Sequence, residues 1–431
     1  MKLLLQVLFL LFFYPCFAQH TTLKAGNISA DAKKIKATGM TGFNQGAAII
    51  EIGNQSALMD NKGNFITAPG KFNFPILGRN VVSNLSYRCG LESNLIFPQT
   101  GIFNSYSNAA TYVLVNAKGN VLYTYPGNSK ENYVGGEDAF SERTGFPVTL
   151  THNPVEAPTL YLDYEFIFSD GAKASLKRTS VTCIRQQEWS EGMLPLRKSK
   201  NELIYGYLDK QGKMAVPFSY DAAEPFSEGM AAVAKYDGMH ELKWGFIDKK
   251  GKLLIPLMYS NKPGPFSNGL AKVIPKTITD FSSAFIDKTG AVKFKFAVND
   301  NISNEPFKNG WLFLGNDRNM DTTGKFYTDN EFRKLLALPD SVVMHTENIK
   351  HDQMLLTNQK GDRVGLYNFR DHSFIPPVFC HIGYFDEMAG LAYAALLLRY
   401  DEKNGKNIYR EGYINNEGVF VIIKADAESN W

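Results

Sequence analysis

The sequence predicts an all-β fold in which tandem units of about 39 residues form a curved, solenoid-like array or a propeller. Two observations lead to this prediction: landmarks that recur at a fixed step, and a turn motif that recurs with them. The composition agrees with it, because 36 glycines and 44% hydrophobic residues suit a folded chain with frequent turns.

The fixed step is clearest in the middle of the chain. Residues 206–213 read Gly-Tyr-Leu-Asp-Lys-Gln-Gly-Lys, residues 245–252 read Gly-Phe-Ile-Asp-Lys-Lys-Gly-Lys, and residues 284–290 read Ala-Phe-Ile-Asp-Lys-Thr-Gly. A second landmark, the head, reads Phe-Ser-Glu-Gly-Met-Ala at 226–231 and Phe-Ser-Asn-Gly-Leu-Ala at 266–271, with related copies at 189–193 and 307–311. We expect the aromatic ring of each head to plug the core. A unit of this size cannot bury its apolar face alone, so neighbouring units must stack.

The turn motif has the form Asp/Asn-x-x-Gly. The first residue caps the turn, and the glycine adopts the left-handed conformation that other residues resist. Between apolar runs, this motif predicts a tight β-hairpin. Copies occur at 60–63, 116–119, 209–212, 248–251, 287–290, 321–324, 358–361 and 415–418, with a shortened copy at 170–171.

Each unit should therefore hold a strand after the head, a strand before the hairpin and a return strand. The return strands at 214–217 and 252–256 are expected to end at their prolines, which cannot donate to a sheet. Residues 331–338 are the one helical window, ended by Pro339, and are interpreted as an insertion or packing helix. We divide the chain into a signal peptide (1–18), degenerate N-terminal β-repeats (19–185), well-formed repeats (186–328), and a helical insertion with degenerate C-terminal β-repeats (329–431).

The first residues have the pattern of a signal peptide. A lysine precedes an apolar run that is too short to span a bilayer, and small residues stand at Cys16 and Ala18. We expect cleavage between Ala18 and Gln19, and hence a secreted or cell-envelope protein; lipid modification of Cys16 is the alternative. No later stretch reaches 18 apolar residues, so no transmembrane segment is expected in the mature chain.

Charge and cysteine content exclude some classes of partner and site. Forty-six basic and 43 acidic residues are interspersed, which gives a net charge of +3 and no footprint for nucleic acid. Cys89, Cys183 and Cys380 are too far apart for a zinc or redox motif. One pair of them could form a disulfide, and three buried thiols are the other interpretation.

The string Lys-Trp-Gly-Phe-Ile-Asp at 243–248, together with the heads, resembles the WG-repeat family, also called KWG repeats. The resemblance is specific over 189–300 and degenerate on both sides. The third unit departs from it, since Ser283 and Ala284 stand where the family has an aromatic residue and glycine. The resemblance implies a binding or scaffold module without a common catalytic site, often in exported bacterial proteins. The Phe-Ala-Gln ending of the signal is similar to that of many exported Bacteroidetes proteins.

Three groups of residues are candidate sites. His345, His351, Asp352, Asp371, His372 and His381 could share a metal, but their spacing matches no ligand template, and ordinary surface histidines are the alternative. Residues 299–305 place oxygen ligands as a calcium loop would, without its glycine, and so favour a solvated turn. The recurring Asp209, Asp248 and Asp287 could suggest a hydrolase, but they fit the recurring hairpin better.

The tryptophans at repeat landmarks, Trp189, Trp244 and Trp311, are expected in the core, with sugar stacking as the alternative. No catalytic, cofactor-binding or metal-binding residue is assigned. The sequence thus predicts an exported, non-catalytic protein that presents a β-repeat surface to a protein or an envelope glycan. The alternative is a secreted hydrolase of cell-surface polymers, with its site in the loops outside the repeats.

Overall fold

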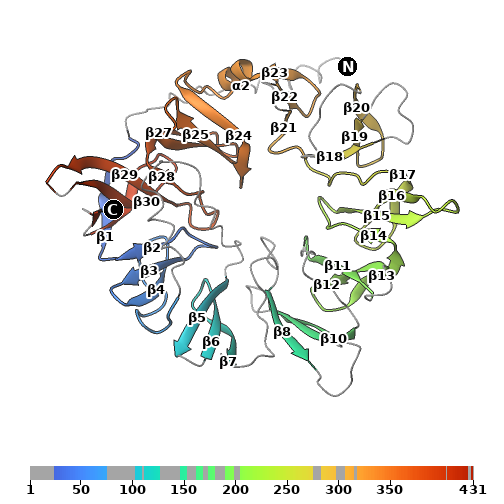
Figure 1. Cartoon of the computed structure of the whole chain (residues 1–431), viewed down its shortest axis with the longest axis horizontal. Coiled ribbons are helices and arrows are strands. Elements are labelled where there is room, and N and C mark those ends of the chain that lie inside the picture. Colours follow the sequence, from blue (N-terminus) through green and yellow to red (C-terminus); the bar gives the residue numbers. More distant parts are fainter. Residues whose placement is uncertain are drawn as a thin grey trace, which may run out of the picture.

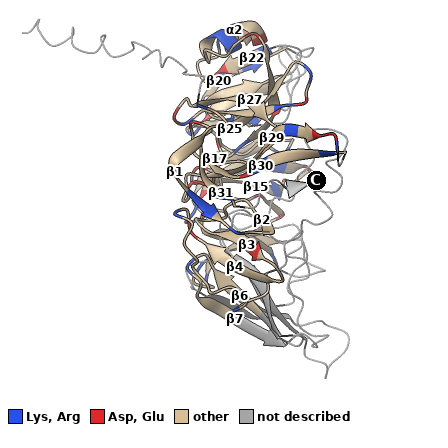
Figure 2. Cartoon of the chain, turned by 90° about the vertical axis from the view of Figure 1, so that its left-hand side faces the viewer, with Lys and Arg blue, Asp and Glu red and all other residues tan. Residues whose placement is uncertain are grey.

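The chain forms a flat ring of small β-sheets (Figures 1 and 2). The computed structural model describes residues 24–74, 102–108, 111–126, 146–152, 162–167, 173–179, 190–198, 204–274, 283–297, 306–314, 318–403, 405–425 and 429–430. The described strands make nine sheets. They follow one another round the ring in chain order, so each sheet is one blade of a propeller.

Most blades are three-stranded antiparallel meanders, and some have a short extra strand. The first five blades contain β2 (Gly39–Met40), β3 (Ala48–Ile52) and β4 (Gln55–Met59); β5 (Ile102–Asn108), β6 (Thr111–Asn116) and β7 (Val121–Pro126); β8 (Phe146–His152), β9 (Leu162–Ile167) and β10 (Lys173–Thr179); β11 (Met193–Arg197), β12 (Tyr205–Asp209) and β13 (Met214–Tyr220); β14 (Ala222–Ala223), β15 (Met230–Tyr236), β16 (Leu242–Asp248) and β17 (Leu253–Tyr259).

The remaining blades contain β18 (Leu270–Val273), β19 (Ser283–Asp287) and β20 (Val292–Phe296); β21 (Trp311–Phe313), β22 (Arg318–Asp321) and β23 (Phe326–Thr328); β24 (Val342–Lys350), β25 (Gln353–Asn358), β26 (Val364–Asn368) and β27 (Phe374–Phe379); β28 (His381–Ile382), β29 (Ala392–Asp401), β30 (Lys406–Ile414), β31 (Phe420–Lys424), β32 (Ser429–Asn430) and β1 (Ile28–Ile35). The helix α2 (Asp329–Leu335) connects β23 to the next blade.

The ring closes by pairing its two ends. Strand β1 pairs in parallel with β31, so the last blade contains strands from both ends of the chain. Ile35 and Phe43 share one apolar cluster with Leu391 and Tyr413, and the rings of Phe43 and Tyr413 lie 4.6 Å apart. The propeller, the second of the two alternatives, therefore describes the ring, whereas the open solenoid-like array, the first choice from the sequence, does not.

The head aromatics join neighbouring blades. Phe226, Phe266 and Phe307 are each at most 1% exposed, as expected for rings that plug the core. Each ring meets an aromatic residue of the blade before it: Phe226 lies 4.9 Å from Tyr207, Phe266 lies 4.8 Å from Phe246, and Phe307 lies 5.2 Å from Phe285. The head is thus part of one blade by sequence and part of the preceding blade by packing.

The glycine of the Trp-Gly pair is required by a bulge in the strand beside it. A Cβ on Gly245 would lie 2.4 Å from the carbonyl oxygen of Ile255. Trp244 pairs with Tyr259, and the next pair is Phe246 with Ile255. Two residues of β16 therefore lie opposite four residues of β17, so β17 bulges at this point. Gly206 and Gly365 face equivalent bulges. Ala284 faces none: it pairs regularly with Lys295.

The expectation that the return strands end at proline is wrong. Strand β13 continues past Pro217 to Tyr220, and β17 continues past Pro256 to Tyr259. The proline lies within the bulged stretch of the outer strand, where its missing N–H costs no sheet hydrogen bond. The β20 strand has no bulge of this kind opposite Ala284 and no proline.

The predicted helix and most predicted hairpins are found. Helix α2 begins at the N-cap Thr328 with a capping box to Glu331, and its Phe332 is buried against Trp311. The motif at 358–361 forms a turn, but it joins β25 to β26, at the opposite end of the sheet from the other hairpins. Its blade uses residues 368–371 instead, and His372 takes a positive φ of 58° there. The copy at 170–171 lies outside the described residues.

No helix in the described ranges is long and apolar enough to cross a membrane.

Candidate functional site

One face of the ring carries the described head turns and the described Asp/Asn hairpins other than that at 358–361, and we call it the turn face. In each sheet, the residue after the head pairs with the first residue of the hairpin: Met193 with Asp209, Met230 with Asp248, and Leu270 with Asp287. Because antiparallel neighbours alternate in direction, the head and the hairpin must emerge at the same end of each blade. The opposite end, the loop face, carries the β3–β4, β15–β16, β25–β26 and β29–β30 connections.

Each complete head is a two-residue turn with both residues in the left-handed region. Glu228 has a φ of 51° and Gly229 has a φ of 83°, and the flanking Ser227 and Met230 form a bridge. Turns with two positive φ values suit the twist of paired strands and favour Asn or Gly at their first position. A glutamate there, at Glu191 and Glu228, costs about 1 kcal/mol or more. Contacts of the glutamate side chain offset this conformational cost.

These contacts run from each head to the next head along the ring, and we call the series the head-to-head ladder. The carboxylate of Glu191 accepts a hydrogen bond from Gly229 N at 3.0 Å, and the carboxylate of Glu228 accepts one from Gly269 N at 2.9 Å. Asn268 Oδ1 accepts one from Gly310 N at 3.1 Å. Beside them, the Ser227 hydroxyl donates to the carbonyl oxygen of Phe266 at 2.6 Å. Each blade is thereby held to the next along the turn face.

The hairpin of the following blade completes the two acidic contacts. Lys249 Nζ lies 3.0 Å from Glu191 and Lys288 Nζ lies 3.3 Å from Glu228. Where the head has the neutral Asn268, the next hairpin has the neutral Thr322 at the position of these lysines. An acidic residue in a head therefore occurs together with a lysine in the hairpin of the next blade, and a neutral residue in a head occurs together with a neutral residue there.

A buried aspartate continues the ladder where the ring closes. Asp386 is 2% exposed and accepts hydrogen bonds from four backbone N–H groups. Two belong to the first head, from Gln45 at 2.7 Å and Gly46 at 2.9 Å, and two to its own turn, from Met388 at 3.1 Å and Ala389 at 2.7 Å. This side chain joins the last blade to the first.

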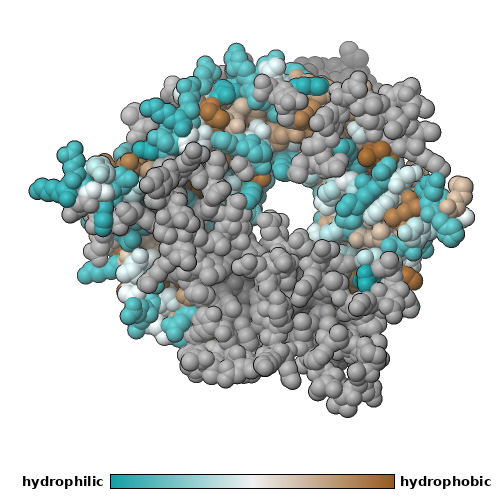
Figure 3. Space-filling view, in the orientation of Figure 1, coloured by the Kyte–Doolittle hydropathy of each residue, from teal (hydrophilic) through white to brown (hydrophobic). Residues whose placement is uncertain are grey.

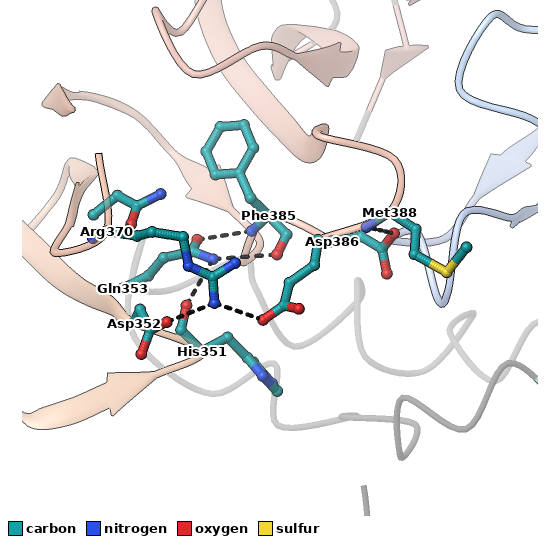
Figure 4. A network of polar contacts seen from close by, with 9 residues as sticks. His351, Asp352, Gln353, Arg370, Phe385, Asp386 and Met388 are labelled. Atoms are coloured by element: carbon teal, nitrogen blue, oxygen red, sulfur yellow. Dashed lines mark hydrogen bonds and ion pairs between the residues drawn. The ribbon is translucent and has the colours of Figure 1, made fainter. Parts of the chain in front are cut away.

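A polar network supports the neighbouring turn (Figure 4). The Arg370 guanidinium lies 2.7 Å from Asp352 and 3.0 Å from Glu387, which bridges two successive heads. The buried Gln353 donates to the carbonyl oxygens of His351 and Phe385 and accepts from Phe385 N at 2.8 Å. Both residues of the turn, His351 and Asp352, have positive φ values of 49° and 61°.

A cavity opens on the turn face between the heads of the β18, β21 and β25 strands. Its volume is about 530 Å³. Most of the described lining is polar, and it comprises Glu228, Ser267, Asn268, Pro306, Phe307, Lys308, Asn309, Ile349, Lys350, His351 and Asp352. Figure 3 shows an opening in the middle of the ring. The cavity is large enough for a small ligand or for a side chain of another polypeptide.

The recurring aspartates serve their own hairpins. Asp209 Oδ1 accepts hydrogen bonds from Gln211 N at 3.0 Å and Lys213 N at 2.9 Å, and Asp248 makes the same pair of contacts. At Asp287, a hydrogen bond from the Thr289 hydroxyl adds to these contacts and lowers the pKa of the carboxyl. Their recurrence follows from the recurrence of the turn, as the hairpin interpretation predicted.

Of the tryptophans in the described ranges, Trp244 belongs to the core and Trp311 is half-buried at its edge. Trp244 is 6% exposed within the cluster shared by two blades, and Trp311 packs against Tyr327 and Phe332. The buried ring of Trp244 is therefore closed to sugar stacking. Trp189 lies outside the described residues.

The C-terminal histidines are not gathered into one site. His345 contacts Thr357 and Glu347, His372 contacts the Tyr367 hydroxyl at 3.0 Å, and Asp352 is occupied by Arg370. Across the described ranges, no group of three or more His, Cys, Asp or Glu residues could hold a metal ion. Cys380 is a buried free thiol, whereas Cys16, Cys89, Cys183 and residues 299–305 lie outside the described residues.

The sequence pattern alone does not single out the residues that join neighbouring turns on this face. Asp386 follows Phe385 as Ser227 follows Phe226, so the head pattern could have identified it. Gln353 and Arg370 gave no such signal, because a single polar residue in a degenerate repeat is indistinguishable from a surface residue.

Burial of His381 predicts an acid-sensitive fold. Desolvation lowers its pKa to about 4, from an ordinary value near 6.5. The neutral ring is therefore favoured in the folded chain. The contribution of this neutral ring to the free energy of unfolding should be fully present above pH 6.5 and fall progressively toward pH 4, by about 3 kcal/mol in total.

Thermal melting of the His381→Asn variant between pH 7 and pH 4.5 should show a shallower decline of the melting temperature than the wild type. His240→Asn, at an exposed turn, is the control and should decline as the wild type does; equal slopes for all three chains would contradict this assignment.

Comparison with known families agrees with the repeat pattern. The sequence model of the family described as "WG containing repeat" matches residues 205–238 and 244–274. This part of the chain therefore carries two WG repeats. The first matched segment runs from β12 to β15, so this sequence repeat starts in one blade and ends in the next. A search of curated proteins found no sequence match.

Among solved structures, the chain is similar to several at low identity. A structure described as a eukaryotic initiation factor is 9% identical, with 91% of each chain covered and a TM-score of 0.33. BamB from Moraxella catarrhalis is 8% identical over 78% of this chain and 98% of that one, with a TM-score of 0.28. The WD40 domain of Toxoplasma gondii coronin is 10% identical over 70% and 83%, with a TM-score of 0.26.

Proposed function

We propose that this chain is an exported, non-catalytic binding protein that presents its turn face to a protein or an envelope glycan. One observation carries the proposal: a constant backbone frame displays different exposed side chains from blade to blade. In each hairpin the first residue accepts the same two backbone hydrogen bonds, while the third residue is exposed and varies. That position holds Lys62, Lys118, Gln211, Lys250, Thr289, Thr323 and Glu417.

Surfaces of this kind are typical of recognition, because function concentrates in the loops that a rigid scaffold positions. The carboxylates that could have suggested a hydrolase are engaged in turns or ion pairs, which favours binding over catalysis. Residues 1–23 lie outside the described part of the chain, so export rests on the signal pattern in the sequence.

The proposal is tested with two charge-matched surface variants. One reverses three lysines of the turn face, Lys62→Glu, Lys118→Glu and Lys250→Glu. The control reverses three lysines of the loop face, Lys360→Glu, Lys403→Glu and Lys406→Glu. Capture from cell-envelope extract and binding to a glycan array should be lost with the first variant and kept with the second.

The opposite pattern would move the binding surface to the loop face. Cleavage of extract polymers by the wild-type chain would replace binding with the hydrolase alternative. Export is tested separately by N-terminal sequencing of the native protein, which should begin at Gln19; a lipid-modified Cys16 would contradict that cleavage site.

A further inference from the structure

The head-to-head ladder is interrupted at one place in the described part of the ring. It runs from Glu191 through Glu228 and Asn268 to Gly310, and it resumes at Asp386. Between these stretches, the side chain of Asn309 forms no hydrogen bond with any described residue. The next head is the turn at His351 and Asp352, and the cavity of about 530 Å³ lies at this interruption.

The interruption leaves donors without the acceptor that other heads receive. The second residue of a head donates its backbone N–H to a carboxylate or amide oxygen from the preceding head, as at Gly229, Gly269 and Gly310. Asp352 occupies this position, and its N–H meets no acceptor in the described part of the chain. Lys350, which also lines the cavity, forms no ion pair with a described carboxylate.

The two carboxylates of the lining are already engaged. Glu228 accepts from Gly269 N and pairs with Lys288 Nζ at 3.3 Å, and Asp352 pairs with Arg370 at 2.7 Å. They therefore offer no strong partner for an incoming cation. The donors that remain, namely an ammonium, an amide NH₂ and a backbone N–H, suit an anion with two oxygens.

We propose that this cavity binds an acidic side chain of a partner polypeptide, whose carboxylate contacts Lys350, Asn309 and the N–H of Asp352. The inference rests on the proposed binding function and narrows its partner to a protein with an exposed acidic segment. The ring itself contains the model for this contact: the carboxylates of Glu191 and Glu228 bind the equivalent turn in their own neighbours. Phe307, the only Phe, Tyr or Trp of the described lining, is 1% exposed, so it offers no open ring face for sugar stacking.

The test is a direct binding measurement with the full-length mature chain. Fluorescein-labelled hexaglutamate is titrated with protein at 0.15 M salt, with hexaglutamine and an oligogalacturonate as comparison probes. We expect hexaglutamate to bind and hexaglutamine not to bind. Lys350→Glu should weaken hexaglutamate binding at least about tenfold, because it removes one charged hydrogen bond and places a carboxylate that repels the probe. Asn309→Ala should weaken it about threefold.

Lys252→Glu is the matched control, since it reverses an exposed lysine in a different blade and should change binding by less than about twofold. Equal effects of Lys350→Glu and Lys252→Glu would show nonspecific attraction and overturn the proposal. Absence of hexaglutamate binding would overturn it too, as would preferential binding of the oligogalacturonate through Lys350. Lys350→Gln removes the charged contact without adding a negative charge. Circular dichroism of every variant distinguishes the loss of that contact from a loss of folding.

This inference can fail while the proposed function stands. If Lys350→Glu still captures the envelope partner and the triple turn-face variant does not, the partner binds the hairpins rather than the cavity. If neither variant affects capture, the turn face itself is not the binding surface.

Discussion

Asp386→Ala should destabilise the ring by about 4 kcal/mol, the cost of leaving several buried N–H groups without an acceptor. Two of those groups belong to the first blade and two to the last, so the loss falls on the closure of the ring. We expect a lower urea midpoint and faster proteolysis within β1, because the only described strand that pairs with β1 is β31 of the last blade.

Asp60→Ala is the control for this experiment. Asp60 accepts hydrogen bonds from Lys62 N at 2.9 Å and Asn64 N at 2.7 Å, but within a single exposed hairpin. Its removal should cost about 1 kcal/mol and leave β1 protected. Equal losses for the two variants would mean that Asp386 contributes only to its local turn.

Gly245→Ala should cost about 3 kcal/mol. The new Cβ would lie 2.4 Å from the carbonyl oxygen of Ile255 and 2.7 Å from that of Pro256, and both are backbone atoms that can retreat only by moving the bulge. Gly238→Ala is the matched control, because its Cβ would meet nothing within 4 Å. Thermal unfolding of both variants measures the difference.

The third unit suggests a rescue for the glycine variant. There Ala284 pairs regularly with Lys295, which stands at the position of Pro256 in the alignment of the two units. Combining Gly245→Ala with Pro256→Lys should restore donation to the sheet and recover part of the lost stability. A double variant that is less stable than Gly245→Ala alone would show that the bulge is fixed by other contacts.

The same comparison shows why much of the fold could be predicted. Each landmark is local: a hairpin needs its Asp and Gly within four residues, and a head needs its turn beside an aromatic ring. Helix α2 was likewise predictable from one apolar window that ends at Pro339, although its first residues and the cap at Thr328 were not. Because each local signal recurs at a fixed step, several weak signals together predict the fold.

Closure and the candidate site could not be predicted in this way. Strand β1 has no repeat landmark, and its partner β31 lies at the other end of the chain, so no local pattern links them. The cavity exists because one head lacks the acceptor that its neighbours have. That is visible only when successive turns are placed side by side. The Trp-Gly motif is visible in the sequence, but the bulge that requires its glycine is not, because a proline in a strand pattern predicts the end of the strand.

The pairing of β1 with β31 also has a consequence for how the chain is made. During synthesis, Ile28–Ile35 emerges early and must wait, without its partner strand, until Phe420–Lys424 has left the ribosome. Contacts between such distant segments form slowly, since a long loop must close first. Until then the last blade presents an open edge that other chains can join. A nascent chain of this kind needs protection for nearly the whole of its translation, and a protein truncated near its end would lose its first strand's partner as well as its last strand.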